Sequence, residues 1–329
     1  MNAPVPATAE LSGLAARVVT DALGAGATVV GTAMLGLAPG SAVLRVRLAG
    51  SPSPLALKLV RADERPRTDL ARTAAATALA RSVGVAVPEV LGVDPTGRVP
   101  GWQYLLQEHV VGSSWREVAP RLSEEERWRV HGEIAATLLA LGSLRLPGFG
   151  QLTAGGAAAG TDLTPALRER AALRVGPAAA RALAEELLGR YGDRLAAAPP
   201  TLCHDDLHHD NLLVRRARGR WRLAAVLDWD HAWAGPAESD LARVALWDDM
   251  TGPGFWSVYR AAVPETDDER ERLAVHQLLW CLEYDASTPR HRADTAALAR
   301  RLGLTPPVVR LRRRSPRPGP RGHLRWRWG

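Results

Sequence analysis

The densest group of polar side chains in the sequence lies at residues 204–211, in the segment HDDLHHDN. Its aspartate Asp206 is followed five residues later by Asn211. A second group, Asp-Trp-Asp at 228–230, ends the apolar run 223–227. Two short strands would therefore present carboxylates and an amide at neighbouring ends. Phosphoryl transfer from a nucleotide needs these groups, because a carboxylate must accept a proton from the attacking hydroxyl and oxygen ligands must hold a divalent metal.

Lys58 is the one lysine among 42 basic residues, in a chain rich in Ala, Gly, Pro and Arg. That composition indicates a GC-rich coding sequence, which favours arginine over lysine. Lysine is a compact ammonium on a flexible stem, whereas guanidinium is a planar fork. A site that needs a slim point charge against phosphate oxygens tolerates the first and not the second. Lys58 is therefore the candidate cation for nucleotide phosphates.

The order and spacing of these residues resemble the aminoglycoside phosphotransferase family, a kinase-like family of small-molecule kinases. Its catalytic loop reads roughly H-G-D-x-x-x-x-N, and a segment like V-I-D-W replaces the protein-kinase D-F-G. The matches here are HDDLHHDN at 204–211 and VLDW at 226–229. The spacing from Asp to Asn equals that of the kinase pattern H-R-D-L-x-x-x-N. Other similar segments, which extend the resemblance over about residues 28–300, are VPEVLG at 87–92, LLQEHVVG at 105–112, PGFG at 147–150 and SDLA at 239–242.

The resemblance implies a role for each matching residue. Asp206 would be the catalytic base. Asn211 and Asp228 would bind magnesium, and Lys58 would contact the phosphates of ATP. Asp240 would brace the catalytic loop by hydrogen bonds from beneath. The remaining implied cofactor-binding positions are Gly36, Gly40 and Ser41 in the loop over the phosphates, Glu108 with nearby backbone in the hinge against adenine, and His208, which either approaches a phosphate or is solvated.

The catalytic loop departs from the family pattern at two places. Asp205 stands where the family usually has glycine. Its charge would either raise the pKa of a neighbouring carboxylate by repulsion or make a different metal contact. His-Asp at 209–210 replaces the common Pro-Gly, which changes the expected turn.

A third departure concerns the helix glutamate that pairs with the lysine in kinase-like proteins. No such glutamate is apparent. Thr73 or Arg72 stands near its place, and the nearby acids are Glu64 and Asp69. These departures keep a second hypothesis open, a non-catalytic nucleotide-binding protein with a kinase-like fold.

Hydrophobic patterning predicts an α+β fold of two lobes, with a small β-rich N-lobe and a larger, mainly helical C-lobe. The resemblance implies that this fold is like that of protein kinases. Ser123 and Glu126 form a capping-box pattern at the start of one helix of the second lobe. The predicted domains are a nucleotide-binding lobe at 1–112, a helical lobe with catalytic loop and acceptor site at 113–307, and a basic disordered tail at 308–329. The predicted helices cover 11–24, 67–82, 164–198, 238–247, 267–284 and 294–302, and the predicted strands cover 28–35, 42–49, 55–60 and 102–111, with a strand entry at 87–91 and a turn at 94–101.

The acceptor is expected to be a hydroxyl of a small molecule. Aminoglycoside-like compounds come first, only through the resemblance; choline, macrolide and sugar acceptors stay open because the fold does not name the acceptor. Four acids lie where family members build the acceptor site, and they either attract a cationic acceptor or are solvated. These acids are Asp248, Asp249, Glu283 and Asp285. Most of five tryptophans nearby are expected in the core, with one or two lining an acceptor pocket: Trp229, Trp233, Trp247, Trp256 and Trp280.

Composition narrows the class of protein. The formal net charge is +7, but eight arginines lie between Arg310 and Arg327, and without them the charge becomes −1. The body therefore supplies no argument for a specific nucleic-acid partner. Cys203 and Cys281 are too few for a disulfide framework and fit buried thiols in a reducing cytoplasm. We expect no membrane span and no secretory signal, hence a cytoplasmic protein; its oligomeric state stays open.

Overall fold

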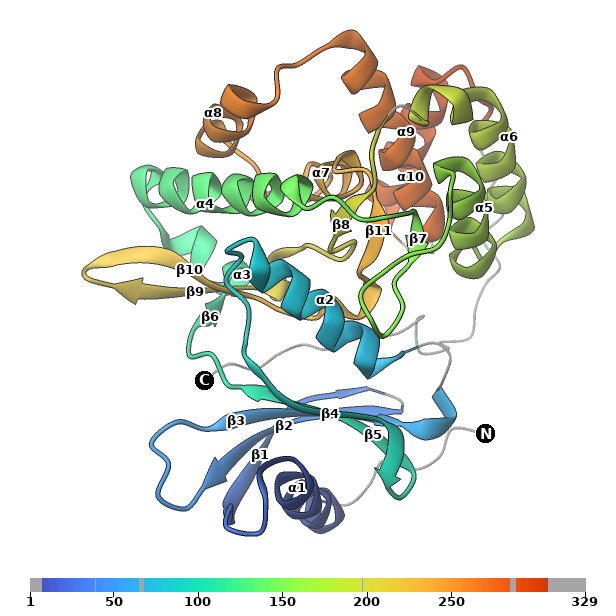
Figure 1. Ribbon diagram of the computed structural model, residues 1–329. Helices are drawn as coiled ribbons and strands as arrows, with labels where there is room; N and C mark the ends of the chain where they lie inside the picture. The colour runs from blue at the N-terminus through green and yellow to red at the C-terminus, as the bar shows by residue number, and fades with distance from the viewer. Residues whose placement is uncertain (1–7, 39, 65–67, 197, 285–287, 307–329) are drawn as a thin grey trace.

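The computed structural model describes residues 8–38, 40–64, 68–196, 198–284 and 288–306. It has a small lobe built on one five-stranded sheet and a larger lobe of helices with two short sheets (Figure 1). The tail predicted at 308–329 lies outside the described residues. The boundary predicted at residue 112 falls in the link between strands β5 and β6.

The sheet of the small lobe is antiparallel, in the order β1-β2-β3-β5-β4. Helix α1 (Thr8–Leu23) covers one face, and α2 (Leu70–Ser82) lies between the other face and the helical lobe (Figure 1). The strands are β1 (Val29–Ala38), β2 (Ser41–Leu48), β3 (Leu55–Arg61), β4 (Val90–Val99) and β5 (Trp102–Glu108).

Alternation along β3 determines where the lysine points. Successive side chains of a strand face opposite sides of the sheet. Leu57 and Leu59 are fully buried in the core shared with α1. Val60 packs with Leu70 of α2 on the opposite face. Lys58, of the same parity as Val60, therefore points toward α2 and the helical lobe.

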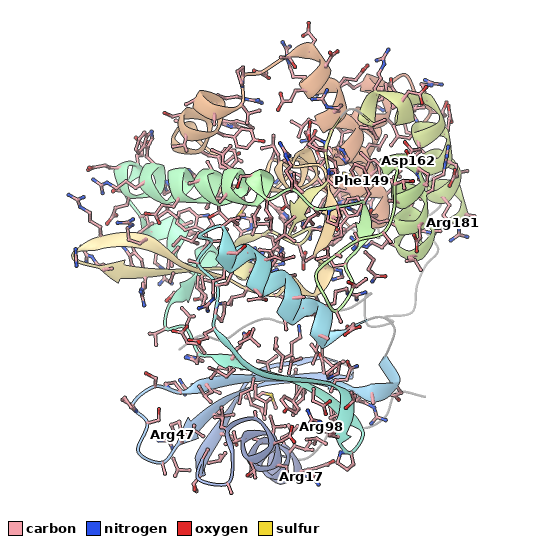
Figure 2. The ribbon with its side chains drawn as sticks, in the orientation of Figure 1. Arg17, Arg47, Arg98, Phe149, Asp162 and Arg181 are labelled. Atoms are coloured by element: carbon pink, nitrogen blue, oxygen red, sulfur yellow. The ribbon has the colours of Figure 1, made fainter. Side chains whose placement is uncertain are left out.

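Polar contacts attach α1 to the far end of the sheet. The Tyr104 hydroxyl donates a hydrogen bond of 2.5 Å to Asp21 of α1. Arg98, labelled beside α1 in Figure 2, places its guanidinium 3.7 Å from the same carboxylate. These contacts lie away from the helical lobe, so we assign them a structural role.

The helical lobe begins after the link from β5. Ser123 and Glu126 form the predicted capping box at the start of α4. One small sheet has β10 (Arg220–Val226), β9 (Leu212–Ala217) and β6 (Ser113–Ser114), and the other has β7 (Gly150–Gln151), β11 (Trp233–Gly235) and β8 (Thr201–Cys203). The helices are α3 (Trp115–Val118), α4 (Glu124–Ser143), α5 (Leu163–Arg174), α6 (Ala178–Leu195), α7 (Glu238–Val244), α8 (Pro253–Ala262), α9 (Asp267–Glu283) and α10 (Pro289–Arg301).

Two predicted elements need correction, and one helix was not predicted. The strand predicted at 102–111 ends at Glu108, where the chain leaves the ladder. Residues 94–99 of the turn predicted at 94–101 lie inside β4, where the pairing with β5 is irregular between Asp94 and Val99. There the Asp94 carboxylate accepts hydrogen bonds from the backbone nitrogens of Thr96 and Arg98 at 2.8 and 2.7 Å. Helix α8 was not predicted, since Gly-Pro-Gly at 252–254 reads as a loop, although proline suits the first helical position. Gly254 lets α8 approach α4: an added Cβ would lie 2.0 Å from the Trp128 carbonyl oxygen.

Both cysteines are free and buried, as expected. Among the helices of the described ranges, none is long and apolar enough to cross a membrane.

Candidate active site

The loop between β8 and β9 places the predicted catalytic carboxylate beside the predicted amide ligand. The Asn211 side-chain nitrogen donates a hydrogen bond of 2.8 Å to the Asp206 carbonyl oxygen and lies 3.5 Å from its Oδ2. Residues His209–Asn211 form a single 3-10 turn that closes the loop. The five-residue spacing therefore brings the two side chains together.

Asp240 of α7 supports this loop from beneath, as predicted. Its carboxylate accepts hydrogen bonds from the backbone nitrogens of His204 and Asp205 at 2.8 and 2.7 Å. The His204 ring is also fully used, because Nε2 bonds the Leu227 carbonyl oxygen at 2.8 Å and Nδ1 accepts from the Asp206 nitrogen at 3.1 Å. With both ring nitrogens engaged, His204 holds the loop rather than moving a proton.

The β9–β10 ladder places Asp228 next to Asn211. Leu212 pairs with Val226, and the Leu227 nitrogen donates to the Asn211 carbonyl oxygen at 2.9 Å. Asp228 has a positive φ of 63°. Non-glycine residues in this region are uncommon, and they concentrate at functional sites.

The donor atoms of Asn211 and Asp228 fit a magnesium ion. Within the described ranges, no hydrogen bond reaches Asn211 Oδ1 or Asp228 Oδ2. Magnesium prefers oxygen ligands and is commonly held by one or two protein groups, with water and substrate phosphates completing its shell. Nor do the described residues group three or more His, Cys, Asp or Glu side chains into a metal site, so an all-protein cage is not what this site offers.

Lys58 reaches from the small lobe to the segment that follows β10. Its Nζ lies 2.9 Å from Asp228 Oδ1 and 2.5 Å from Asp230 Oδ2. Burial alone would lower the pKa of the ammonium, but the two carboxylates outweigh it and raise the pKa above its ordinary value. Lys58 therefore stays charged.

The helix acid expected opposite the lysine is absent from α2, whose sequence contains no Asp or Glu. Asp69 instead caps the helix, accepting a hydrogen bond of 3.0 Å from the Ala71 nitrogen. The side chain of Glu64 lies outside the part of the chain that the structure describes. Thr73, noted in the sequence as standing near this place, donates through Oγ1 to Asp230 Oδ1 at 3.0 Å.

Asp205 occupies the glycine position of the family pattern with a φ of 60°. Its carboxylate faces α5, where it pairs with Arg170 at 2.9 Å and with Arg174. Burial would raise its pKa, but the arginines lower it below the ordinary value. Both carboxylate oxygens are engaged by arginine, which disfavours the expected alternative of a metal contact. The charge of Asp205 adds to burial in raising the pKa of Asp240.

The other loop departure also has partners. Asp210 pairs with Arg116 at 2.7 Å, and His209 Nε2 bonds the Asp248 carbonyl oxygen. His208 is 3% exposed, which excludes the solvated alternative. Its Nε2 lies 3.9 Å from Asp206 Oδ1.

The residues expected around the nucleotide lie in the small lobe and its link. Gly36, Gly40 and Ser41 belong to the β1–β2 hairpin, in which Ala38 pairs with Ser41 and Gly40 has a φ of 77°. Glu108 ends β5, where its backbone nitrogen bonds the Glu89 carbonyl oxygen at 2.8 Å. The roles of these four residues in nucleotide binding stay predictions.

Arg243 was not predicted as a site residue, although it lies three residues after Asp240 on α7. Its guanidinium is ion-paired with Asp206 Oδ1, donates to the Tyr284 hydroxyl at 2.8 Å, and lies 4.7 Å from the Trp280 ring centroid. The one available signal was the helical spacing, which places Asp240 and Arg243 on one face.

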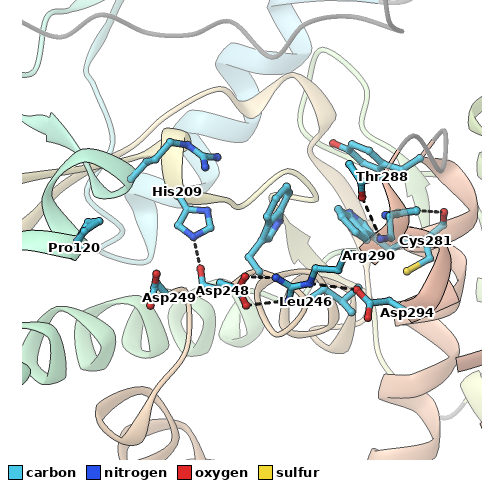
Figure 3. A pocket seen from close by; sticks show the side chains of 15 residues that line it. Pro120, His209, Leu246, Asp248, Asp249, Cys281, Thr288, Arg290 and Asp294 are labelled. Carbon is cyan, nitrogen blue, oxygen red and sulfur yellow. Dashed lines mark hydrogen bonds and ion pairs between the residues drawn. The ribbon is translucent and has the colours of Figure 1, made fainter. Parts of the chain in front are cut away.

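A cavity of about 520 Å³ lies beside this cluster (Figure 3). Two of the five noted tryptophans, Trp247 and Trp280, line it together with Tyr284. Arg290 crosses its floor, 2.9 Å from Asp248 and 3.6 Å from Asp294 (Figure 3).

The acids expected to attract a cation are largely paired. Asp248 is bound by Arg290, and Glu283 accepts two hydrogen bonds from Arg170 at 2.7 and 3.0 Å. Asp285 lies outside the described residues. Arg290 therefore offsets part of the negative charge that Asp248 and Asp294 bring to this cavity.

The sequence model of the phosphotransferase enzyme family, APH, matches residues 35–276. The chain belongs to this family. Acyl-CoA dehydrogenase family member 11 of Pongo abelii is 28% identical over 198 residues, which make up 57% of this chain and 25% of that protein. The chain thus matches about a quarter of the length of that curated relative.

Solved structures show the same fold. Aminoglycoside phosphotransferase APH(4)-Ia, in a ternary complex with AMP-PNP and hygromycin B, superposes with a TM-score of 0.63 at 17% identity, covering 88% of this chain and 96% of that one. The streptomycin–ATP–APH(2")-IIa ternary complex gives 0.58 at 14% identity, covering 90% and 97%. The predicted two-lobed, kinase-like α+β fold is confirmed.

Proposed function

We propose that this phosphotransferase moves the γ-phosphate of ATP, with magnesium, to a hydroxyl of a small molecule. One observation carries the proposal: Lys58 of the small lobe pairs with two carboxylates of the segment 228–230. This segment follows directly on Leu227, whose backbone nitrogen is hydrogen-bonded to the loop that holds Asp206 and Asn211. A cation for phosphates, two oxygen ligands and a carboxylate therefore converge from distant parts of the chain.

Each residue has a defined task in this reaction. Asp206 accepts the proton of the acceptor hydroxyl. The oxygen of that hydroxyl attacks the γ-phosphorus, and the bond between the γ-phosphorus and the oxygen bridging to the β-phosphate breaks, so that ADP leaves. Lys58 binds the nucleotide phosphates. Asn211 and Asp228 would hold magnesium, which supplies charge neutralisation at the phosphate oxygens. His208, buried beside Asp206, would approach the transferred phosphate.

The nucleotide would lie between the two lobes. Gly36, Gly40 and Ser41 would cover the phosphates, with glycine allowing close backbone approach. Glu108 and nearby backbone would bind adenine. We keep the cytoplasm as the expected location.

The cavity beside Arg243 is the proposed acceptor site. One side chain connects the cavity wall to Asp206, because Arg243 contacts Trp280 and Tyr284 of the wall as well as Asp206. Indole faces suit rings with an apolar side, and the paired acids reduce the attraction for a multiply charged cation. Sugar acceptors therefore deserve the same weight as aminoglycosides in a test, alongside macrolides and choline.

The test is ATP consumption with magnesium across that panel of acceptors. We expect acceptor-dependent release of ADP that chelation by EDTA stops and added magnesium restores. Asp206→Ala should lower turnover by about 10²–10⁴-fold while nucleotide binding stays measurable. Unchanged turnover in Asp206→Ala would overturn the mechanism.

The alternative of a non-catalytic nucleotide-binding protein rested on Asp205 and on the missing helix acid. Asp205 is paired with two arginines, and Lys58 has carboxylate partners. These contacts favour the enzyme. Nucleotide binding without transfer to any acceptor would favour the alternative.

A further inference from the structure

Lys58 has two carboxylate partners, and both come from the segment after β10. Asp228 and Asp230 approach its ammonium at 2.9 and 2.5 Å. Lys58 is buried, and each of the two aspartate side chains is 17% exposed. A buried ammonium needs a partner that stays in place through the reaction. The question is which of the two carboxylates does so.

Asp228 is committed elsewhere under the proposed function, because it would share its carboxylate with magnesium. Asp230 has no such task. Its Oδ2 faces Lys58, and its Oδ1 accepts the hydrogen bond of 3.0 Å from Thr73. One carboxylate thus joins the lysine of β3 to helix α2.

The local backbone explains why both aspartates face the lysine. Asp228 adopts the left-handed conformation, and residues Trp229–His231 form one 3-10 turn. Trp229 between them is 2% exposed, and its Nε1 donates to the Val226 carbonyl oxygen at 3.1 Å. The buried indole anchors the turn, so the residues on either side of it project toward Lys58.

We propose that Asp230 is the positioning residue for Lys58, in place of the carboxylate that α2 lacks, and that Thr73 holds Asp230 from the helix. The proposal rests on the proposed function, since it assigns the group that keeps the phosphate-binding ammonium in place. The carboxylate has moved from the small lobe to the helical lobe. Thr73 contributes a hydroxyl where an acidic side chain would repel Asp230.

This arrangement predicts that a carboxylate at position 73 of α2 can replace the carboxylate of Asp230. Thr73→Glu alone places a second carboxylate close to that of Asp230, where like charges repel. Asp230→Asn alone removes the carboxylate and leaves its amide beside Lys58. The double variant has one carboxylate again, now on α2 and facing the same ammonium. Each single substitution should therefore lower kcat/KM, and the two together should restore part of it.

The experiment compares the full-length wild type, Asp230→Asn, Thr73→Glu and the double variant. For each we would measure kcat and KM for ATP with the active acceptor, the dissociation constant of MgATP without acceptor, and the melting temperature. We expect each single variant to lose about 100-fold in kcat/KM, as misplaced reacting groups do. The double variant should recover about 10-fold or more over Asp230→Asn.

Thr73→Gln combined with Asp230→Asn is the matched control, because glutamine has nearly the shape of glutamate without its charge. We expect no recovery of kcat/KM in this control. Thr73→Val, which removes the hydroxyl alone, guards against misfolding of the Glu variant and should weaken MgATP binding while the protein stays folded. Equal recovery in the Gln and Glu double variants, or none in either, would overturn the proposal.

Failure of the proposed function is distinguishable from failure of this inference. If the wild type binds MgATP but transfers phosphate to no acceptor, the proposed function fails. The order of MgATP affinities among the same variants then decides the role of Asp230. A wild type that binds no nucleotide overturns both.

Discussion

The guanidinium of Arg243 is ion-paired with the carboxylate of Asp206, and both side chains are buried. The same guanidinium lies over Trp280 and donates to the hydroxyl of Tyr284, two residues that line the proposed acceptor cavity. The carboxylate that we propose as catalytic is thus held by a side chain that touches the cavity wall. Under the proposed function, Arg243 influences the hydroxyl of the acceptor only through Asp206.

Arg243→Gln should lower kcat by about 100-fold, because a carboxylate that loses its holding partner takes other rotamers. KM for ATP should change little, since Arg243 has no described contact with Lys58 or Asp228. Arg243→Lys should have a kcat between those of Arg243→Gln and the wild type, because an ammonium does not stack on aromatic rings as a guanidinium does. Steady-state kinetics with the active acceptor check this.

Arg168→Gln is the control for that substitution. Arg168 makes one exposed ion pair, with Glu185 at 3.2 Å, and such pairs contribute little. Its kinetics should match the wild type. Wild-type kcat in Arg243→Gln would show that Asp206 needs no such support.

Replacing Asp205 by glycine should destabilise the protein, although glycine is the family residue and suits a φ of 60°. The change removes one of the two buried carboxylates, Asp205 and Glu283, that Arg170 and Arg174 share. Removing one member of a buried ion pair typically costs about 3–5 kcal/mol in the free energy of unfolding. Urea unfolding of Asp205→Gly against the wild type measures the loss.

The matched control is Arg218→Gly, which also replaces a residue of positive φ, 49°, but in the exposed turn between β9 and β10. We expect its free energy of unfolding to stay within about 0.5 kcal/mol of the wild type. An Asp205→Gly protein as stable as this control would mean that Glu283 alone compensates both arginines.

Asp240→Ala should loosen the catalytic loop. It removes the acceptor of two backbone hydrogen bonds, from His204 and Asp205, and leaves both nitrogens buried. Each unsatisfied group costs about 1–3 kcal/mol. Amide hydrogen exchange at these two residues should accelerate, and Asp240→Asn, which keeps one acceptor oxygen, should show a smaller effect. Unchanged exchange in the alanine variant would contradict the bracing role.

Acidification should destabilise the protein through His276 of α9. Burial is the main cause that lowers its pKa, to about 4; Glu238 and Asp205 oppose this effect, whereas Arg170 and Arg272 add to it. The unfolded chain binds a proton near the ordinary histidine pKa of about 6.5, so between these values it holds more protons than the folded protein. The free energy of unfolding therefore falls as pH drops through this window.

His276→Gln should flatten that part of the stability curve, measured by urea unfolding at a series of pH values. Buried carboxylates with lowered pKa values, such as Asp205, lose their contribution only as the pH falls below the ordinary aspartate value. The two effects therefore separate by pH. A variant with the same slope as the wild type in the upper window would exclude His276 as the cause.

Short stretches of sequence determined the catalytic loop. Asp206 and Asn211 are five residues apart within one loop, and Asp228 lies two residues after the end of β10, which pairs with β9. Local spacing restricts such geometry strongly, so motif and structure agree. Strand alternation likewise determined the side of the sheet that Lys58 faces.

Only the tertiary structure decided which partners these residues have. Lys58 and Asp230 are 172 positions apart, and Asp206 and Arg243 are 37 apart. The sequence alone showed that a helix acid was missing, not that two carboxylates of the other lobe pair with Lys58. It also showed an unusual Asp205, but not the arginines of α5 that neutralise it. Burial makes a charge costly unless another charge meets it, and packing of distant elements determines which one does.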